Sequence, residues 1–139
     1  MQPRSEDVYL LDTSAWFSFM EDEEGAEEVE RILKKAHVLL PFIVLLEVYY
    51  ISLREKGEDI ADKRYALLMS LGAETLWDVD EPTLLTAGRF KALYRLSLAD
   101  ALIAALAKRK GAILVHKDPE YEVLSKEVRQ VVLPYKRPC

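Results

Sequence analysis

Four acidic residues stand where an ionised carboxylate would be costly, within or beside runs of apolar residues. They are Asp12, Glu47, Asp100 and Asp118. A carboxylate that leaves water needs a cation, a set of hydrogen-bond donors or a proton. Four such residues in a chain of 139 residues indicate a shared cation site.

Each acid also has a structural interpretation. Asp12 could stabilise the positive end of a following helix, and Glu47 could pair with a distant arginine. Ser97-Leu-Ala-Asp100 matches a capping box, and Asp118 could begin a turn with Pro119. These four interpretations are independent of one another, whereas one cation site explains all four acids.

The ligand types favour a hard divalent cation. Mg²⁺ and Mn²⁺ prefer carboxylate and water oxygen. The chain has two histidines and one cysteine, Cys139, which argues against a zinc centre and excludes an intrachain disulfide. A carboxylate cluster with Mg²⁺ or Mn²⁺ suits metal-dependent hydrolysis of phosphodiester bonds.

Apolar segments with strand and helix character alternate along the chain. We expect strands at 8–12, 38–40, 75–79, 113–116 and 128–133, and helices at 13–20, 24–36, 41–56, 60–71, 82–93 and 97–110. In the helix at 60–71, Ile60, Ala61, Tyr65, Leu68 and Leu71 should face inward. The pattern predicts one α/β domain over residues 1–139, with a mainly parallel sheet covered on both faces. Sites in such folds gather at the carboxyl ends of strands, where Asp12 and Asp118 fall.

Composition and charge describe a globular cytoplasmic protein. Half of the residues are apolar and 31% are charged. No secretory signal and no apolar run long enough to span a bilayer is visible. The net charge is −5, but seven acids lie within residues 21–30, so the remainder is net positive and compatible with a polyanionic substrate.

At these motifs the chain resembles the PIN-domain ribonucleases, especially the VapC-type toxins of toxin–antitoxin pairs. Leu11-Asp12-Thr13-Ser14 resembles the opening Asp-Thr-Ser of the family, and Glu47 resembles its mid-chain acid. The segment 97–104 resembles the third motif, and Asp118-Pro-Glu-Tyr121 resembles the Asp-x-Asp-Phe after the penultimate strand. Two positions depart from the family: His116 replaces a Thr or Ser, and Glu120 replaces an Asp.

The resemblance implies a PIN-like three-layer fold and a ribonuclease site that uses Mg²⁺ or Mn²⁺. Asp12, Glu47 and Asp100 would hold the metal, and Asp118 would complete the site. Thr13, Ser14 and Glu120 are candidates for positioning water or substrate. An activated water would attack the phosphodiester in line, without a covalent enzyme intermediate.

The resemblance further implies a homodimer and a cognate antitoxin that blocks the active groove. Trp16, Phe17, Phe19 and Met20 support such contacts, because they exceed what one short helix can hide. Two other interpretations remain. One is a PIN-like module that binds RNA or a partner without cleavage, which His116 and Glu120 would favour. The other is a receiver-type signalling domain, for which Lys117 stands in a suitable place but which leaves Glu47 and Asp100 unexplained.

Overall fold

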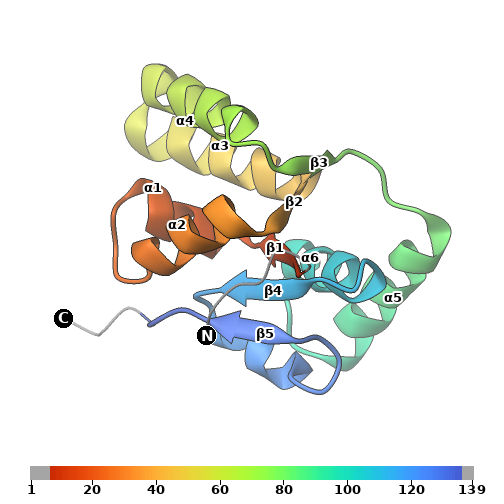
Figure 1. The fold of residues 1–139 in the computed structure, drawn as a ribbon. Coiled ribbons are helices and arrows are strands. Elements are labelled where there is room, and N and C mark those ends of the chain that lie inside the picture. Colours follow the sequence, from red (N-terminus) through yellow and green to blue (C-terminus); the bar gives the residue numbers. More distant parts are fainter. Residues whose placement is uncertain (1–6, 136–139) are drawn as a thin grey trace.

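Five short strands form the centre of the molecule in the computed structural model, which describes residues 7–135 (Figure 1). The strands are β1 (Val8–Leu11), β2 (His37–Pro41), β3 (Glu74–Leu76), β4 (Ile113–His116) and β5 (Gln130–Val132). Their order in the sheet is β3-β2-β1-β4-β5, and all four pairings are parallel. The predicted central parallel sheet is confirmed. Cys139 lies outside the described residues.

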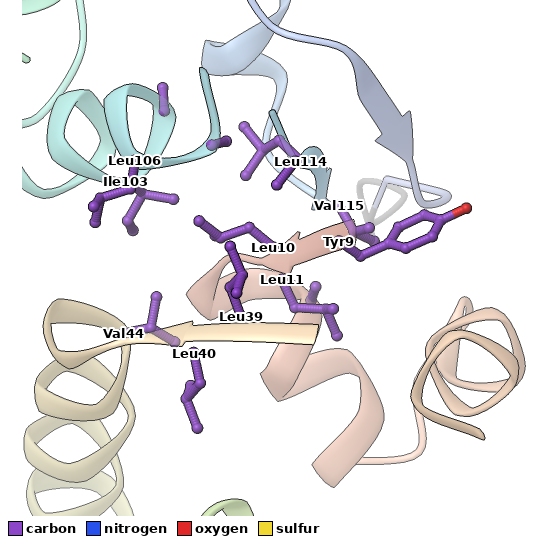
Figure 2. Packing of buried hydrophobic residues seen from close by; sticks show 14 of the residues in the cluster. Tyr9, Leu10, Leu11, Leu39, Leu40, Val44, Ile103, Leu106, Leu114 and Val115 are labelled. Carbon is purple, nitrogen blue, oxygen red and sulfur yellow. The ribbon is translucent and has the colours of Figure 1, made fainter. Parts of the chain in front are cut away.

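Helices connect the strands and cover the sheet. They are α1 (Thr13–Met20), α2 (Ala26–Lys35), α3 (Phe42–Lys56), α4 (Glu58–Ser70), α5 (Glu81–Leu93), α6 (Leu98–Arg109) and the 3₁₀ helix η1 (Pro119–Leu124). Crossovers between parallel strands are right-handed. The chain moves across the sheet in one direction from β1 to β3 and then back to β4, so the helices of these two parts lie on opposite faces. Figure 2 shows this separation around β1, with α6 on one side and α1 on the other. The PIN-like three-layer arrangement is therefore confirmed.

The core joins the central strands to the alanine-rich helix α6. Leu10 of β1 and Leu114 of β4 are fully buried and point toward Ile103 and Leu106 of α6 (Figure 2). Small residues, Ala101, Ala104, Ala105 and Ala107, let α6 approach the sheet closely. The packing fixes the start of α6, and with it Asp100, against the ends of β1 and β4.

Two details of the helices bear on the sequence predictions. Asp12 is the N-cap of α1, and its side chain accepts from the Ala15 amide. Ile60 and Tyr65 of α4 are each 37% exposed, although both were predicted to face inward. The reason is that α4 packs mainly against α3 and not on the sheet, so only Ala61 and Leu68 of α4 are buried.

The strand order places β1 at the point where the chain reverses its direction across the sheet. The chain steps outward from β1 to β2 and β3, then returns to β4 on the other side of β1. In open parallel sheets such a point leaves a crevice outside the carboxyl ends of the two strands. Among residues 7–135, no helix has the length and apolar character to cross a membrane.

Candidate active site

The acidic residues gather at the carboxyl ends of β1 and β4. Asp12 directly follows β1, and its backbone amide donates to the Val115 carbonyl of β4 at 3.0 Å. Asp118 lies two residues after β4 and caps η1. Asp100 lies in the first turn of α6. The site is therefore built where two neighbouring strands and three helix N-termini meet.

Asp12 is the most deeply buried acid, with 3% of its surface exposed. Its carboxylate accepts from the Ser14 hydroxyl at 2.7 and 2.9 Å and from the Ala15 amide at 2.8 Å. The Lys117 amide in turn donates to the Ser14 hydroxyl at 2.9 Å. Burial raises the pKa of Asp12 to about 7; the bonds to Ser14 and Ala15 lower it, while Asp100 and Asp118 raise it further.

Asp100, Asp118 and Glu120 form the tightest group of carboxylates. One oxygen of each lies within 4.8 Å of the others. Burial raises the pKa of Asp100 to about 6, and the charges of Asp118, Glu47 and Glu120 raise it too, against a lowering by a hydrogen bond from Tyr121. The Asp118 carboxylate also accepts from the Glu120 amide at 2.9 Å, which bends Glu120 back toward the site.

Glu47 reaches the site from the other side, on α3. Its carboxylate accepts from the Thr13 hydroxyl at 2.7 Å. The side chain is half-buried, and its charge contributes to the raised pKa of Asp100. Asp12 and Glu47 border the group of Asp100, Asp118 and Glu120 but are not part of it. That Asp12, Glu47 and Asp100 hold the metal and Asp118 completes the site, as the family resemblance implies, stays a prediction.

Some of the acids also have the capping roles that were considered for them, in addition to their place in the acidic site. Asp12 caps α1, Asp118 caps η1, and Ser97 caps α6 by accepting from the Asp100 amide at 3.1 Å. Within residues 7–135, none of the ion pairs involves Asp12, Glu47, Asp100 or Asp118. The arginine partner considered for Glu47 is thus absent from the described part of the chain.

Several residues that support the site were not predicted for this role. His116, Gln130 and Tyr121 form a hydrogen-bonded group behind Asp100 and Asp118. Burial lowers the pKa of His116. The Lys117 ammonium, with a side chain only 5% exposed, donates to the Glu24 carbonyl at 2.8 Å and lies 3.8 Å from a Glu23 carboxylate oxygen. It ties the α1–α2 loop to the end of β4, which is not the role a receiver-type domain would give it.

The arrangement fits a divalent cation. Burial and mutual repulsion raise the pKa values of Asp12 and Asp100, so the ionised cluster is costly without a positive charge. Every candidate ligand atom is a carboxylate oxygen, which suits Mg²⁺ and Mn²⁺. Metal-assisted hydrolysis is the chemistry that this set of residues can perform without a further nucleophile.

The fold and the site define a class of nuclease-like α/β proteins, and the sequence comparison gives the family. The sequence model of the PIN domain matches residues 9–127, so the chain belongs to the PIN domain family. This match spans all four predicted acids.

Individual relatives are VapC proteins. The chain is 29% identical over 128 residues to the VapC ribonuclease Mb1587 of Mycobacterium bovis, a match that covers 86% of this chain and 92% of the relative. Its fold is similar to that in the crystal structure of VapBC2 from Rickettsia felis, with a TM-score of 0.76, 17% identity and coverage of 91% and 99% of the two chains. It is also similar to Mycobacterium tuberculosis VapC20, described as a Sarcin-Ricin loop cleaving toxin, with a TM-score of 0.69, 18% identity and coverage of 92% and 100%.

Proposed function

We propose that this chain is a metal-dependent ribonuclease and the toxin of a type II toxin–antitoxin pair, acting in the cytoplasm as one PIN-like domain of 139 residues. The observation that carries the proposal is the group of acidic residues at the carboxyl ends of β1 and β4. Asp12 and Asp100 have raised pKa values there, and no ion pair within residues 7–135 offsets their charge. The ribonuclease names of the VapC relatives support RNA as the substrate.

Asp100, Asp118 and Glu120 would hold the cation, with Asp12 and Glu47 completing the site directly or through water. Bound Mg²⁺ or Mn²⁺ would activate a water for attack on phosphorus and neutralise charge on a phosphoryl oxygen. Thr13 and Ser14 were predicted to position water or a substrate phosphate. We propose that they also orient two of the acids, because their hydroxyls donate to the carboxylates of Glu47 and Asp12.

The direct test is cleavage of a mixed single-stranded RNA pool in Mg²⁺ or Mn²⁺ by wild type, Asp12→Asn and Asp100→Asn. Asn keeps the shape of Asp and removes its charge. Asp80→Asn is the matched control, because Asp80 is also an N-cap, bonded to the Thr83 amide at 2.9 Å, but is exposed and does not belong to the acidic group. We expect wild type and Asp80→Asn to cleave, and Asp12→Asn and Asp100→Asn to lose at least about 100-fold. Equal cleavage by all four folded proteins would refute the nuclease assignment.

Two exposed apolar surfaces support the proposed protein partners. The first lies on α5 and α6, where Leu84 and Leu98 are 59% and 74% exposed and line a hollow of about 570 Å³. We assign this surface to the homodimer, because exposed apolar area of this kind marks interfaces. We expect Leu84→Glu with Leu98→Glu to turn a dimer into a monomer in sedimentation measurements. A wild type that is already monomeric at micromolar concentration would contradict the assignment.

The second surface lies on α3, α4 and the segment after β3, and we assign it to the antitoxin segment. Leu46 of α3 and Trp77 after β3 are 54% and 58% exposed, and they line a hollow of about 380 Å³ with Tyr49 and Tyr65. The solved VapBC complexes are toxins with their antitoxins, which supports such a partner. Of the α1 residues considered for partner contacts, Trp16 is fully buried, and Phe17, Phe19 and Met20 are partly buried and pack against the core.

A further inference from the structure

A tyrosine stands behind the acidic group where the family motif has a phenylalanine. The Tyr121 hydroxyl donates to Asp100 Oδ1 at 2.9 Å, although the two residues lie 21 positions apart. Tyr121 is fully buried. A phenylalanine would fill the same space and would have no donor for Asp100. The hydroxyl is therefore an addition that packing alone does not require.

The tyrosine is held by a second departure from the family motif, His116. The His116 ring packs against the Tyr121 ring with centroids 4.8 Å apart. Its Nδ1 accepts from the Asp118 amide at 3.1 Å, and its Nε2 meets Gln130 Oε1 at 2.7 Å. Thr or Ser at position 116 could not make both contacts.

The hydrogen bonds of this group determine one another. The Tyr121 carbonyl can only accept, so it fixes the Gln130 amide nitrogen toward itself, at 2.8 Å. Gln130 Oε1 then faces His116 and can only accept, so Nε2 carries the ring proton and Nδ1 accepts from Asp118. These contacts therefore allow one orientation of the Gln130 side-chain amide and one tautomer of the His116 ring. A network that is satisfied throughout holds its members in one geometry.

This group acts on two of the proposed metal ligands at once. Its hydroxyl fixes the orientation of the Asp100 carboxylate, and its imidazole fixes the backbone of Asp118, whose own carboxylate holds the Glu120 amide. All three residues of the tightest acidic group are thus oriented from one side. Residues that orient metal ligands in this way commonly change metal affinity by 10–100-fold when removed.

We propose that Tyr121, held by His116 and Gln130, is a positioning residue that orients Asp100 for the divalent cation shared with Asp118 and Glu120. The proposal rests on the metal-dependent function proposed above. It assigns to the two departures from the family motif a common task, and it predicts that the hydroxyl of Tyr121 matters for metal binding and not for the fold alone.

The test compares Mn²⁺ binding to wild type and Tyr121→Phe, by the loss of the free Mn²⁺ signal in electron paramagnetic resonance. Tyr135→Phe is the matched control: it removes an exposed tyrosine hydroxyl that donates to Glu122 at 2.8 Å, and neither residue belongs to the acidic group. We expect Tyr121→Phe to weaken Mn²⁺ binding by about tenfold or more. Tyr135→Phe should bind Mn²⁺ as wild type does. In RNA cleavage, Tyr121→Phe should lower kcat at a fixed Mn²⁺ concentration with little change in KM.

A second variant keeps the test decisive if Tyr121→Phe does not fold. Gln130→Met removes the hydrogen bonds of Gln130 and leaves the Tyr121 hydroxyl in place, and it should weaken Mn²⁺ binding in the same direction by a smaller factor. Folded variants that bind Mn²⁺ within twofold of wild type, beside a wild type that binds and cleaves, would overturn the positioning role alone. A wild type that neither binds Mn²⁺ nor cleaves RNA would overturn both this role and the proposed function.

Discussion

Replacing Asp12 by Asn should stabilise the metal-free protein at neutral and alkaline pH. Asp12 is almost completely buried, and its pKa rises from an ordinary value of 3.8 to about 7. Such a difference corresponds to roughly 4 kcal/mol of destabilisation once the carboxylate is ionised. Asn keeps an acceptor for the Ala15 amide but changes the bonds with Ser14, which costs about 1 kcal/mol. The net gain at pH 8 should be about 3 kcal/mol.

The sign of the pH dependence follows from the direction of the pKa shift. A carboxyl whose pKa is raised in the folded state binds its proton more tightly there than in the unfolded chain. The wild type is therefore penalised as the pH rises from about 4 to 7, by about 1.4 kcal/mol per pH unit from Asp12 alone. At pH 5 the penalty on the wild type is only about 1–2 kcal/mol, and the hydrogen-bond cost of Asn offsets about 1 kcal/mol of it, so Asp12→Asn should differ from wild type by less than about 1 kcal/mol.

Urea unfolding in EDTA at pH 5, 6, 7 and 8 measures this difference. Subtracting the two proteins at each pH removes shared contributions, including that of His116, whose lowered pKa acts with the opposite sign. Asp80→Asn is the control, because Asp80 is an exposed N-cap whose pKa is lowered mainly by its bonds to Thr83. Its difference from wild type should stay nearly constant from pH 5 to 8. If Asp12→Asn were as stable as wild type at pH 8, or less stable, the ionised Asp12 carboxylate would not destabilise the folded protein.

Three further outcomes are expected. Mg²⁺ or Mn²⁺ should raise the urea midpoint of wild type more at pH 8 than at pH 5, because Asp12 and Asp100 must lose protons to bind the cation. RNA cleavage should decline below about pH 6 for the same reason. Equal stabilisation at both pH values would contradict this. Thr13→Val removes the 2.7 Å donor to Glu47 and should slow cleavage about tenfold with less than about 1 kcal/mol lost in urea unfolding, whereas an unchanged rate would mean that Glu47 needs no such support. Lys117→Met should cost about 1–2 kcal/mol, because the Glu24 carbonyl loses its donor; proteolysis at the α1–α2 loop that stays as slow as in wild type would show that Lys117 does not hold this loop.

The sequence predicted the strands and the edge of the sheet where the acids lie. The apolar runs before Asp12 and Asp118 are continuous, as buried parallel strands require, and β4 has the predicted bounds Ile113–His116. The position of these two acids follows directly, because parallel strands place their carboxyl ends at one edge. Asp100 was predictable as inward-facing from the alanines that follow it on α6.

The contacts that orient the acids could not be predicted in this way. Thr13 meets Glu47 across 34 positions, and Tyr121 meets Asp100 across 21. Such pairs depend on how far α3 and η1 approach the crevice, which side-chain packing decides and periodicity does not. The same limit explains α4, where the apolar spacing predicted five inward-facing residues although the helix packs mainly against α3 and buries only Ala61 and Leu68.

The capping and metal-binding interpretations of the acids turn out to share one geometric cause. In a parallel α/β sheet the carboxyl end of each strand leads into the N-terminus of a helix, so that edge collects positive helix ends. Asp12 and Asp118 cap α1 and η1, and Asp100 lies in the first turn of α6. The helix ends attract the carboxylates but do not offset their burial and mutual repulsion, because the pKa values of Asp12 and Asp100 remain raised. A capping motif in the sequence therefore does not argue against a cation site here: it brings the acids to the edge where a cation is needed.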